Sequence, residues 1–408
     1  MKLETTEFLV VGCGPAGATA AREAARAGIA TTVLEKDAVV GAKRVCAAGL
    51  RPGFCQTFDL PRQLVHCDTP RLALFDPDGG EHEVFFGPGH TTTREELDGT
   101  MAARALGEGA QIRTQSLFRG LERSGDRTIV EYADYRSGER RRIAARSVFL
   151  AQGATAPYER VRGASDGGVP AFTYDAWNDG LMTTLQYRVY LDRPAASIAY
   201  RTLELHYYAA ADGRTIVAWM FPKRDHLAIG LGLVGKLGGA ELRAELERFT
   251  ERVRGRLYPD AHVLRVKQEG HLLYGGLPRP RVSDGAVMVG GTAAGLVDAT
   301  NGEGIFEAAM SGRLAADAIR TYRNQGSRAA AHYARALRER FARRLTHRVE
   351  LMRFLEARPA RFRVLFEQLA GSPNFSDALA REDGERSFMD RVHLYAHAAR
   401  FALRAARA

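Results

Sequence analysis

The chain has 408 residues, 45% of them hydrophobic and 26% charged, with a formal net charge of +10. A chain of this composition is too apolar for an intrinsically disordered protein and long enough for two or three folded substructures. No apolar run reaches the ~18 residues that a membrane-spanning helix needs, and the first predicted strand begins almost at Met1. We therefore expect no signal peptide and a location in the cytoplasm or at the inner face of the membrane.

The N-terminal segment carries the pattern of a strand–helix–strand unit. A strand is predicted over 8–12, an alanine-rich helix over 16–27 and a second strand over 31–34. The first turn, Gly12-Cys13-Gly14-Pro15-Ala16-Gly17, fits G-x-G-x-x-G in the required strand–turn–helix context, and Glu35 closes the second strand. This combination predicts a bound dinucleotide.

Each part of this motif has a physical role in dinucleotide binding. Gly12 permits the tight turn, Gly14 lets the backbone approach a pyrophosphate, and Gly17 allows close packing of the helix on the strand. The helix N-terminus stabilises the phosphates. Glu35 accepts the ribose hydroxyls, which argues against a cofactor with a 2′-phosphate at this position. Only one such unit is present, so we expect one dinucleotide to stay bound and any nicotinamide cofactor to bind only transiently.

The following elements alternate between the first substructure and a second one. A helix is predicted over 94–105, a strand over 111–117, and a strand over 147–152 that ends before Gly153. Alternating runs between 181 and 234 predict an antiparallel sheet, followed by a helix over 240–257. A buried strand over 285–291 and a helix over 302–319 then complete the first substructure.

This order predicts an α/β fold with a discontinuous first domain. We assign residues 1–75, 94–165 and 276–325 to a Rossmann-like dinucleotide-binding domain. Residues 76–93 and 166–275 form an antiparallel-sheet substrate domain. Residues 326–408 form a helical C-terminal region with a break at 371–373.

A second glycine cluster follows the late buried strand and opens a helix. Its backbone amides are suited to hold the ribityl-phosphate region and the electron-rich edge of an isoalloxazine ring. The alternative is a glycine-rich helix start without a ligand. The residues assigned to cofactor binding here are Gly291, Thr292, Gly295, Gly302, Gly304 and Ile305.

Together these motifs resemble the geranylgeranyl reductase family of FAD enzymes. This family lies within a larger group that includes para-hydroxybenzoate-hydroxylase-like monooxygenases and flavin halogenases. The resemblance runs from about 7 to 319 and more loosely through the C-terminal helices. It rests on the Gly12–Gly17 loop with Glu35, and on the segments 43–50, 58–61, 94–98, 219–223, 230–232 and 293–305. The chlorophyll and bacteriochlorophyll geranylgeranyl reductases have the same features in the same order.

The resemblance implies that reduced FAD saturates isolated C=C bonds of a prenyl chain on a pigment or isoprenoid lipid. NADPH or reduced ferredoxin is the implied transient electron donor. Because such an alkene is unpolarised, a proton must be delivered along with the electrons, and the chain must lie in a dry apolar tunnel. Cys46 matches a cysteine beside the flavin that packs or relays a proton, and is the catalytic candidate; a small buried residue is the alternative.

The resemblance also assigns further residues to the two ligands. Trp219 and Phe221 line the substrate cavity, or else belong to the plain core. Arg94 contacts FAD near the pyrophosphate and the ring; the alternative is an Arg that caps a helix or faces solvent. The remaining implied cofactor contacts are Pro15, Ala16, Lys36, Ala47 and Leu117.

The chain departs from the family pattern at several positions. Thr292 stands where the family has an Asp that accepts a hydrogen bond from the ribityl chain, and Thr carries no charge. Ala47 and Ala48 replace a Gly-Gly pair, and Gln152 replaces an Asp before Gly153. These changes put the exact substrate in doubt more than the cofactor.

The basic character of the chain is concentrated at its C-terminus. Residues 320–408 hold 19 Arg and 9 acidic residues, so they account for the whole net charge. The segments 335–345 and 391–407 place apolar residues at helical spacing against Arg, which is typical of an amphipathic helix at an anionic membrane surface. The alternative is a solvated helix packed on the main body. No nucleic-acid motif accompanies the arginines, so we expect no nucleic-acid partner.

Two other interpretations remain open from the sequence. A flavin monooxygenase or halogenase could use the same scaffold, although such halogenases carry a second Trp where this chain has Val217. A flavoprotein that has lost turnover is suggested by Thr292 and Gln152. The four cysteines lack metal-ligand spacing, so we expect free thiols and no metal.

Overall fold

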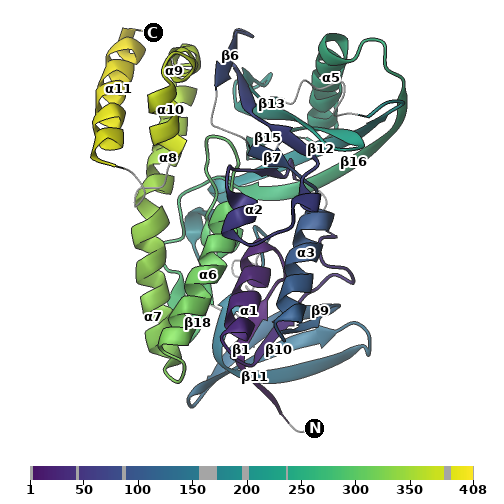
Figure 1. Ribbon diagram of the computed structural model, residues 1–408, viewed down its shortest axis with the longest axis vertical. Helices are drawn as coiled ribbons and strands as arrows, with labels where there is room; N and C mark the ends of the chain where they lie inside the picture. Colours follow the sequence, from purple (N-terminus) through teal and green to yellow (C-terminus); the bar gives the residue numbers. More distant parts are fainter. Residues whose placement is uncertain are drawn as a thin grey trace.

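The computed structural model describes residues 3–42, 46–84, 89–155, 172–194, 202–235, 238–380 and 387–407, with the backbone alone at 377 and 380. It contains two large sheets, a small one and a set of C-terminal helices (Figure 1). The predicted α/β class is confirmed: a Rossmann-like body is joined to a second, largely antiparallel sheet. Within the described ranges, none of the helices is both long and apolar enough to cross a bilayer.

The first sheet carries the N-terminal strand–helix–strand unit. Its order is β17–β18–β11–β1–β2–β8, and β10 and β9 branch from β11. The strands β18, β11, β1, β2 and β8 run parallel. The elements are β1 (Glu4–Val11), α1 (Pro15–Arg26), β2 (Thr31–Leu34), β8 (Gln111–Arg113), β9 (Ser116–Ser124), β10 (Arg127–Asp134), β11 (Glu139–Leu150), β17 (Ser283–Asp284) and β18 (Val287–Val289).

Parallel strands covered on both faces are apolar, and this sheet follows that rule only where its parallel strands are buried, over 8–11, 33–34, 148–150 and 287–289. Helix α1 packs between α3 (Arg94–Gly107) and α6 (Ile305–Thr321). The single strand predicted over 111–117 is divided into β8 and β9. The reason is Gln115, whose φ of +58° turns the chain between them.

The second sheet has the order β16–β12–β15–β14–β13–β5–β6. Its first five strands pair antiparallel, as predicted, but β5 pairs parallel with β13. Residues 71–75 therefore belong to this sheet, which corrects their assignment to the dinucleotide-binding domain; the other domain boundaries stay a prediction. The strands are β5 (Arg71–Phe75), β6 (Glu81–Val84), β12 (Leu181–Leu191), β13 (Thr202–Ala209), β14 (Thr215–Pro222), β15 (His226–Val234) and β16 (Val263–Tyr274).

A small sheet lies at the junction between the two large ones. It consists of β3 (Gly49–Leu50), β7 (Gly89–Thr91) and β4 (Cys67–Thr69). The Thr91 hydroxyl donates to the Pro222 carbonyl at the end of β14, with an oxygen–oxygen distance of 2.7 Å. Helix α2 (Phe54–Thr57) follows β3, and α5 (Gly239–Leu257) covers the second sheet on its other side. This junction fixes the segment around Cys46 against β14.

The C-terminal helices pack on both halves of the protein. α7 (Gly326–Leu337) continues through a π-helical turn at 338–342 into α8 (Arg343–Glu356), and α9 (Ala360–Ala370), α10 (Pro373–Ala380) and α11 (Phe388–Arg407) follow. Leu337, Phe341 and Leu345 are buried in the core of the first sheet. The amphipathic segment 335–345 thus packs on the main body, which corrects the expectation of a membrane-facing helix there.

Candidate active site

A cavity of about 1290 Å³ lies where the two large sheets and helices α8 to α10 meet. Both glycine clusters line one part of it, and apolar side chains of the second sheet and the C-terminal helices line the rest. The volume exceeds the ~300–1,000 Å³ typical of a pocket for one drug-sized ligand. It therefore has room for a large cofactor together with an elongated substrate.

The first glycine loop has the geometry that its motif predicts. Gly12 has a φ of +96°, and a Cβ there would lie 2.5 Å from the Ala151 carbonyl oxygen. A Cβ on Gly17 would lie 1.8 Å from the Gly12 carbonyl oxygen, so Gly17 lets α1 approach the strand. Gly14, Pro15 and the helix N-terminus line the cavity, whereas Gly17 does not. The loop offers backbone N–H groups and a positive helix end to an anion.

Glu35 is positioned by the same loop. Its carboxylate accepts hydrogen bonds from the backbone N–H groups of Cys13 at 2.8 Å and Asp37 at 2.9 Å. It also lines the cavity, next to Lys36, whose ammonium group pairs with Asp37 at 2.7 Å. Glu35 thus presents a fixed carboxylate beside the first glycine loop, where a ribose hydroxyl can donate to it.

Arg94 begins α3 and faces Gly14 across the cavity. Its guanidinium forms a two-pronged ion pair with Asp98 one turn later, at 2.9 and 2.6 Å, and its Nη2 would lie 3.5 Å from a Cβ on Gly14. Burial by itself would lower the pKa of Arg94, but the Asp98 carboxylate and the Cys46 side chain outweigh burial and raise it. The guanidinium is therefore a permanent, oriented positive charge at the cavity wall.

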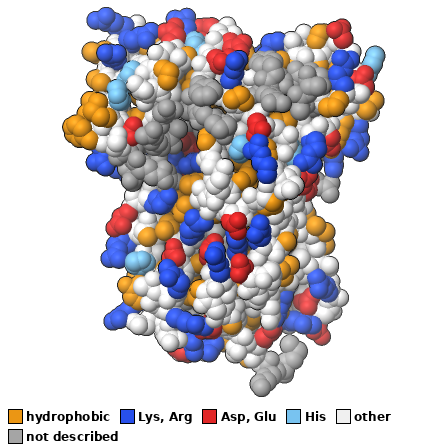
Figure 2. Space-filling model, viewed as in Figure 1, with side chains coloured by type: hydrophobic (Ala, Val, Ile, Leu, Met, Phe, Trp, Pro, Cys, Tyr) orange, Lys and Arg blue, Asp and Glu red, His pale blue; other side chains and the backbone are white. Residues whose placement is uncertain are grey.

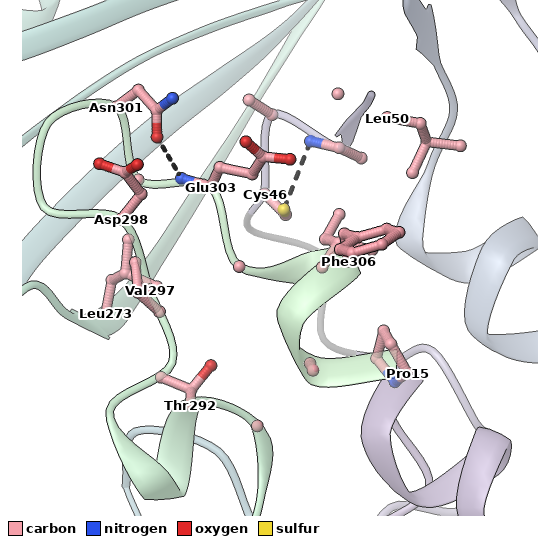
Figure 3. Close-up of a pocket in the computed structure, with 18 of the residues that line it drawn as sticks. Pro15, Cys46, Leu50, Leu273, Thr292, Val297, Asp298, Asn301, Glu303 and Phe306 are labelled. Atoms are coloured by element: carbon pink, nitrogen blue, oxygen red, sulfur yellow. Dashed lines mark hydrogen bonds between the residues drawn. The ribbon is translucent and has the colours of Figure 1, made fainter. Parts of the chain in front are cut away.

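The second glycine cluster forms the opposite wall. The Gly291 N–H donates to the Ser311 hydroxyl at 3.0 Å, and Gly302 and Gly304 precede α6. Figure 3 shows Thr292 below this loop and the Asn301 side chain accepting from the Glu303 N–H at 2.8 Å. Ser311 and Gly295 lie outside the cavity, and Gly295 packs against Pro278 and Tyr274. The residues of this cluster that line the cavity are Gly291, Thr292, Asn301, Gly302, Glu303, Gly304 and Ile305.

Cys46 lies at the cavity between these walls (Figure 3). Its Sγ accepts a hydrogen bond from the Ala48 N–H at 3.3 Å. Ala48 has a φ of +45°, a strained value for a residue with a Cβ. The preceding part of the predicted motif, 43–45, lies outside the described residues.

Lys223 holds this strained turn from behind, a role that the sequence alone did not reveal. Its side chain is 1% exposed, and its ammonium group donates to the carbonyl oxygens of Ala47 and Ala48. Burial lowers the pKa of Lys223 to about 7, although Cys46 and Cys67 act in the opposite direction. Lys223 ends the segment 219–223 that carries the family resemblance, but that pattern assigns it no role.

A cluster of charges lies at the cavity beside Cys46, with Glu307 and Arg344 buried and Arg51 and Glu303 partly buried. Arg51 donates to Glu303 and to Glu307, each at 2.7 Å, and Arg344 of α8 donates to Glu307 at 2.7 Å. Arg348 pairs with Asp298 at 3.1 Å. Burial and the nearby Glu307 raise the pKa of Glu303, and Arg51 opposes them. The cluster ties the C-terminal helices to the second glycine loop, and sequence reasoning missed it.

The rest of the cavity is apolar. Trp219 and Phe221 of β14 both line it, as predicted, and the Trp219 N–H donates to the Gln186 side chain at 3.1 Å. The opposite wall comes from the C-terminal helices, which the sequence analysis treated as separate from the site. The apolar residues that complete this wall are Leu351, Met352, Leu355, Phe362, Leu365, Phe366, Leu369 and Leu379.

Comparison with known proteins finds no matching family model but several related chains. Geranylgeranyl diphosphate reductase from rice chloroplasts is 30% identical over 332 residues, which cover 76% of this chain and 65% of the relative. Its counterpart from Synechocystis is 29% identical over 339 residues, covering 78% and 76%. Digeranylgeranylglycerophospholipid reductase from Thermoplasma acidophilum is 27% identical over 361 residues, covering 84% and 85%.

The chain is similar to the geranylgeranyl reductases, a family of FAD-dependent oxidoreductases, and it spans 65% of the length of the rice relative. Solved structures agree with its fold. A geranylgeranyl bacteriochlorophyll reductase-like protein from Thermoplasma acidophilum superposes with a TM-score of 0.70 at 22% identity, over 95% of both chains. A flavin-dependent brominase superposes with a TM-score of 0.69 at 16% identity, over 96% of this chain and 98% of the other.

The polar part of the cavity fits FAD. A turn with glycine at 12 and 14 opens on the N-terminus of α1, a fixed carboxylate stands beside it, and a second glycine loop also lines the cavity. Two predicted residues, Gly17 and Gly295, shape the loops without lining the cavity. The predicted residues that line it are Gly12, Gly14, Pro15, Ala16, Glu35, Lys36, Cys46, Ala47, Arg94, Leu117, Trp219, Phe221, Gly291, Thr292, Gly302, Gly304 and Ile305.

Proposed function

We propose that this protein saturates C=C bonds of a geranylgeranyl or similar prenyl chain on a pigment or isoprenoid lipid. The observation that carries the proposal is the division of one cavity into a glycine-lined polar part and an apolar part. A dinucleotide cofactor matches the first part and a long hydrocarbon matches the second. The related chains named as prenyl reductases support the same reaction.

The chain's own residues divide the work of binding FAD. The N-terminus of α1 and Gly14 hold the pyrophosphate, Glu35 holds the ribose, and the loop from Gly291 to Ile305 holds the flavin half. Arg94 adds a positive charge to that site. Bound FAD would supply, once reduced, a hydride, which brings an electron pair and one hydrogen to the C=C bond.

Other residues hold the substrate and a proton. Trp219, Phe221 and the facing side chains of α8 and α9 keep the prenyl chain extended and exclude water from it. Cys46 holds a proton at Sγ, beside the cavity, and donates it to the second carbon of the C=C bond, the one that does not receive the hydride. Lys223 positions Cys46 by fixing the carbonyl oxygens of Ala47 and Ala48.

The electrons come from NADPH or reduced ferredoxin in this proposal. The one dinucleotide motif of the chain is assigned to FAD, so the electron donor binds only transiently. The substrate partner is a hydrophobic prenylated molecule. Since such molecules reside in membranes, we extend the proposal to a peripheral contact of the Arg-rich C-terminal region with the membrane surface.

The experiment incubates the FAD-loaded protein with a geranylgeranylated pigment and with a digeranylgeranylated lipid, under anaerobic conditions and with each donor. We expect a product heavier by two hydrogen atoms for each bond reduced. A substrate that keeps every double bond with all donors contradicts the proposal. A parallel measurement in air identifies the alternatives: substrate-dependent oxygen consumption indicates a monooxygenase or halogenase, and failure to retain FAD indicates a flavoprotein without turnover.

A further inference from the structure

Helix α11 is apolar on two opposite sides. Phe401 and Ala405 are buried against the rest of the protein, and Leu394 packs beside them. Residues in an α-helix advance by about 100° each, so the side opposite these residues carries 388, 392, 395, 399 and 403. All five are apolar or aromatic and exposed. We call the side chains of Phe388, Val392, Tyr395, Ala399 and Leu403 the outer face of α11.

The outer face is an unusual concentration of exposed apolar surface. Phe388 is 79% exposed, Tyr395 71%, Leu403 68% and Val392 41%, and the adjoining Met389 is 56% exposed. Figure 2 shows hydrophobic side chains gathered at the left edge of the molecule, where Figure 1 places the first turns of α11. Single exposed apolar residues need no explanation, but a contiguous apolar face marks an interaction site.

The charges beside this face indicate what it binds. Arg391 flanks one edge, and Arg400 and Arg407 flank the other, all exposed. The only acidic residue of α11 is Asp390, which is buried on the inner side. An apolar helix face edged by Arg matches an anionic lipid surface, because the Arg side chains reach the phosphates while the apolar residues enter the acyl boundary. Docking of two copies of this face would place the Arg residues of one copy against those of the other, and their like charges disfavour such a dimer.

The position of α11 links this face to the substrate cavity. Phe401 and Ala405 belong to the same apolar core as Phe362, Leu365 and Leu369, which line the cavity. The outer face is therefore one helix removed from the apolar part of the cavity. We propose that the outer face of α11 docks on an anionic lipid bilayer and brings the apolar part of the cavity next to the membrane. This docking rests on the proposed function only in its purpose, because binding itself needs no turnover.

The test measures co-sedimentation of the full chain with vesicles of phosphatidylglycerol and phosphatidylcholine, and with vesicles of phosphatidylcholine alone. The wild-type chain is expected to bind the anionic vesicles and to lose binding at high salt. Tyr395→Asp and Leu403→Asp, combined, are expected to weaken this binding at least tenfold. The matched control combines Tyr135→Asp and Leu264→Asp, which alter the same residue types at 54% and 69% exposure elsewhere on the surface.

The outcomes separate docking from catalysis. Binding that is lost in the α11 variant but kept in the control supports the proposal, whatever the turnover. Equal binding by both variants overturns it, as does a wild-type chain that ignores vesicles and instead forms dimers that the α11 variant does not. Turnover of detergent-solubilised substrate, which needs no docking, is expected to be the same in the α11 variant and the wild type. Its absence in both would contradict the proposed reaction and leave the docking result intact.

Discussion

Lys223 is buried behind the turn at Cys46, and replacing it by Met tests the effect of this burial on stability. Burial lowers the pKa of Lys223 from its ordinary 10.5 to about 7. This difference corresponds to about 5 kcal/mol of free energy, at about 1.4 kcal/mol for each tenfold change in proton affinity. The folded protein bears this cost at low pH because the protonated ammonium group is buried.

The sign of the pH dependence follows from the proton balance. Between pH ~7 and ~10.5 the unfolded chain keeps the Lys223 proton and the folded chain releases it, so the contribution to stability rises with pH in this window. From pH ~7.5 to ~9.5 the gain is about 2 kcal/mol. Lys223→Met has no titrating group at this position, so its stability does not show this gain between the two pH values. The variant also leaves the Ala47 and Ala48 carbonyl oxygens without their donor, at a cost of about 1–3 kcal/mol at either pH.

Urea unfolding of both proteins at the two pH values measures the effect. Every other titrating group is common to both, so subtracting the two free energies of unfolding isolates Lys223. We expect the wild type to gain about 2 kcal/mol on the variant as the pH rises. A difference that stays the same at both pH values would refute the claim that Lys223 loses its proton in the fold.

Four further substitutions test other parts of the site. Gly12→Ala forces a Cβ into a left-handed turn against a backbone oxygen, so we expect a loss of at least about 2 kcal/mol and no retention of FAD on a desalting column. Glu35→Gln removes the charged carboxylate that accepts hydrogen bonds from the ribose hydroxyls, and we expect FAD to bind about tenfold more weakly by fluorescence titration. Arg344→Met leaves Glu307 buried with one partner fewer, and thermal unfolding should show a loss of about 3 kcal/mol. Leu365→Trp narrows the apolar part of the cavity, so KM for a geranylgeranylated substrate should rise while FAD binding stays unchanged.

The parts of the site that the sequence predicted are those encoded locally. The Gly12–Gly17 loop and Glu35 lie within one strand–helix–strand unit, and their geometry depends on residues close in sequence. The Gly302–Ile305 segment was recognisable for the same reason, since a glycine run before a helix has few conformations. Trp219 was placed in the cavity because the family pattern includes it.

The missed parts depend on contacts between distant segments. β5 joins β13 although more than a hundred residues separate them, and no local pattern distinguishes this partner from the first sheet. Arg51 meets Glu307 across an interval of 256 residues. Amphipathic spacing over 335–345 left open whether the apolar helix face meets a membrane or the main body, and it could not show that α7 packs on the first core or that α9 lines the cavity.

The proposed function requires reduced FAD and a prenyl chain to lie in one cavity, and a single-turnover experiment tests this directly. The FAD-loaded protein is reduced anaerobically, freed of excess reductant and mixed with a geranylgeranylated lipid. We predict that the absorbance of oxidised flavin returns and that one double bond is lost for each flavin reoxidised. Flavin that stays reduced, or that reoxidises without any change in the mass of the lipid, would contradict the account.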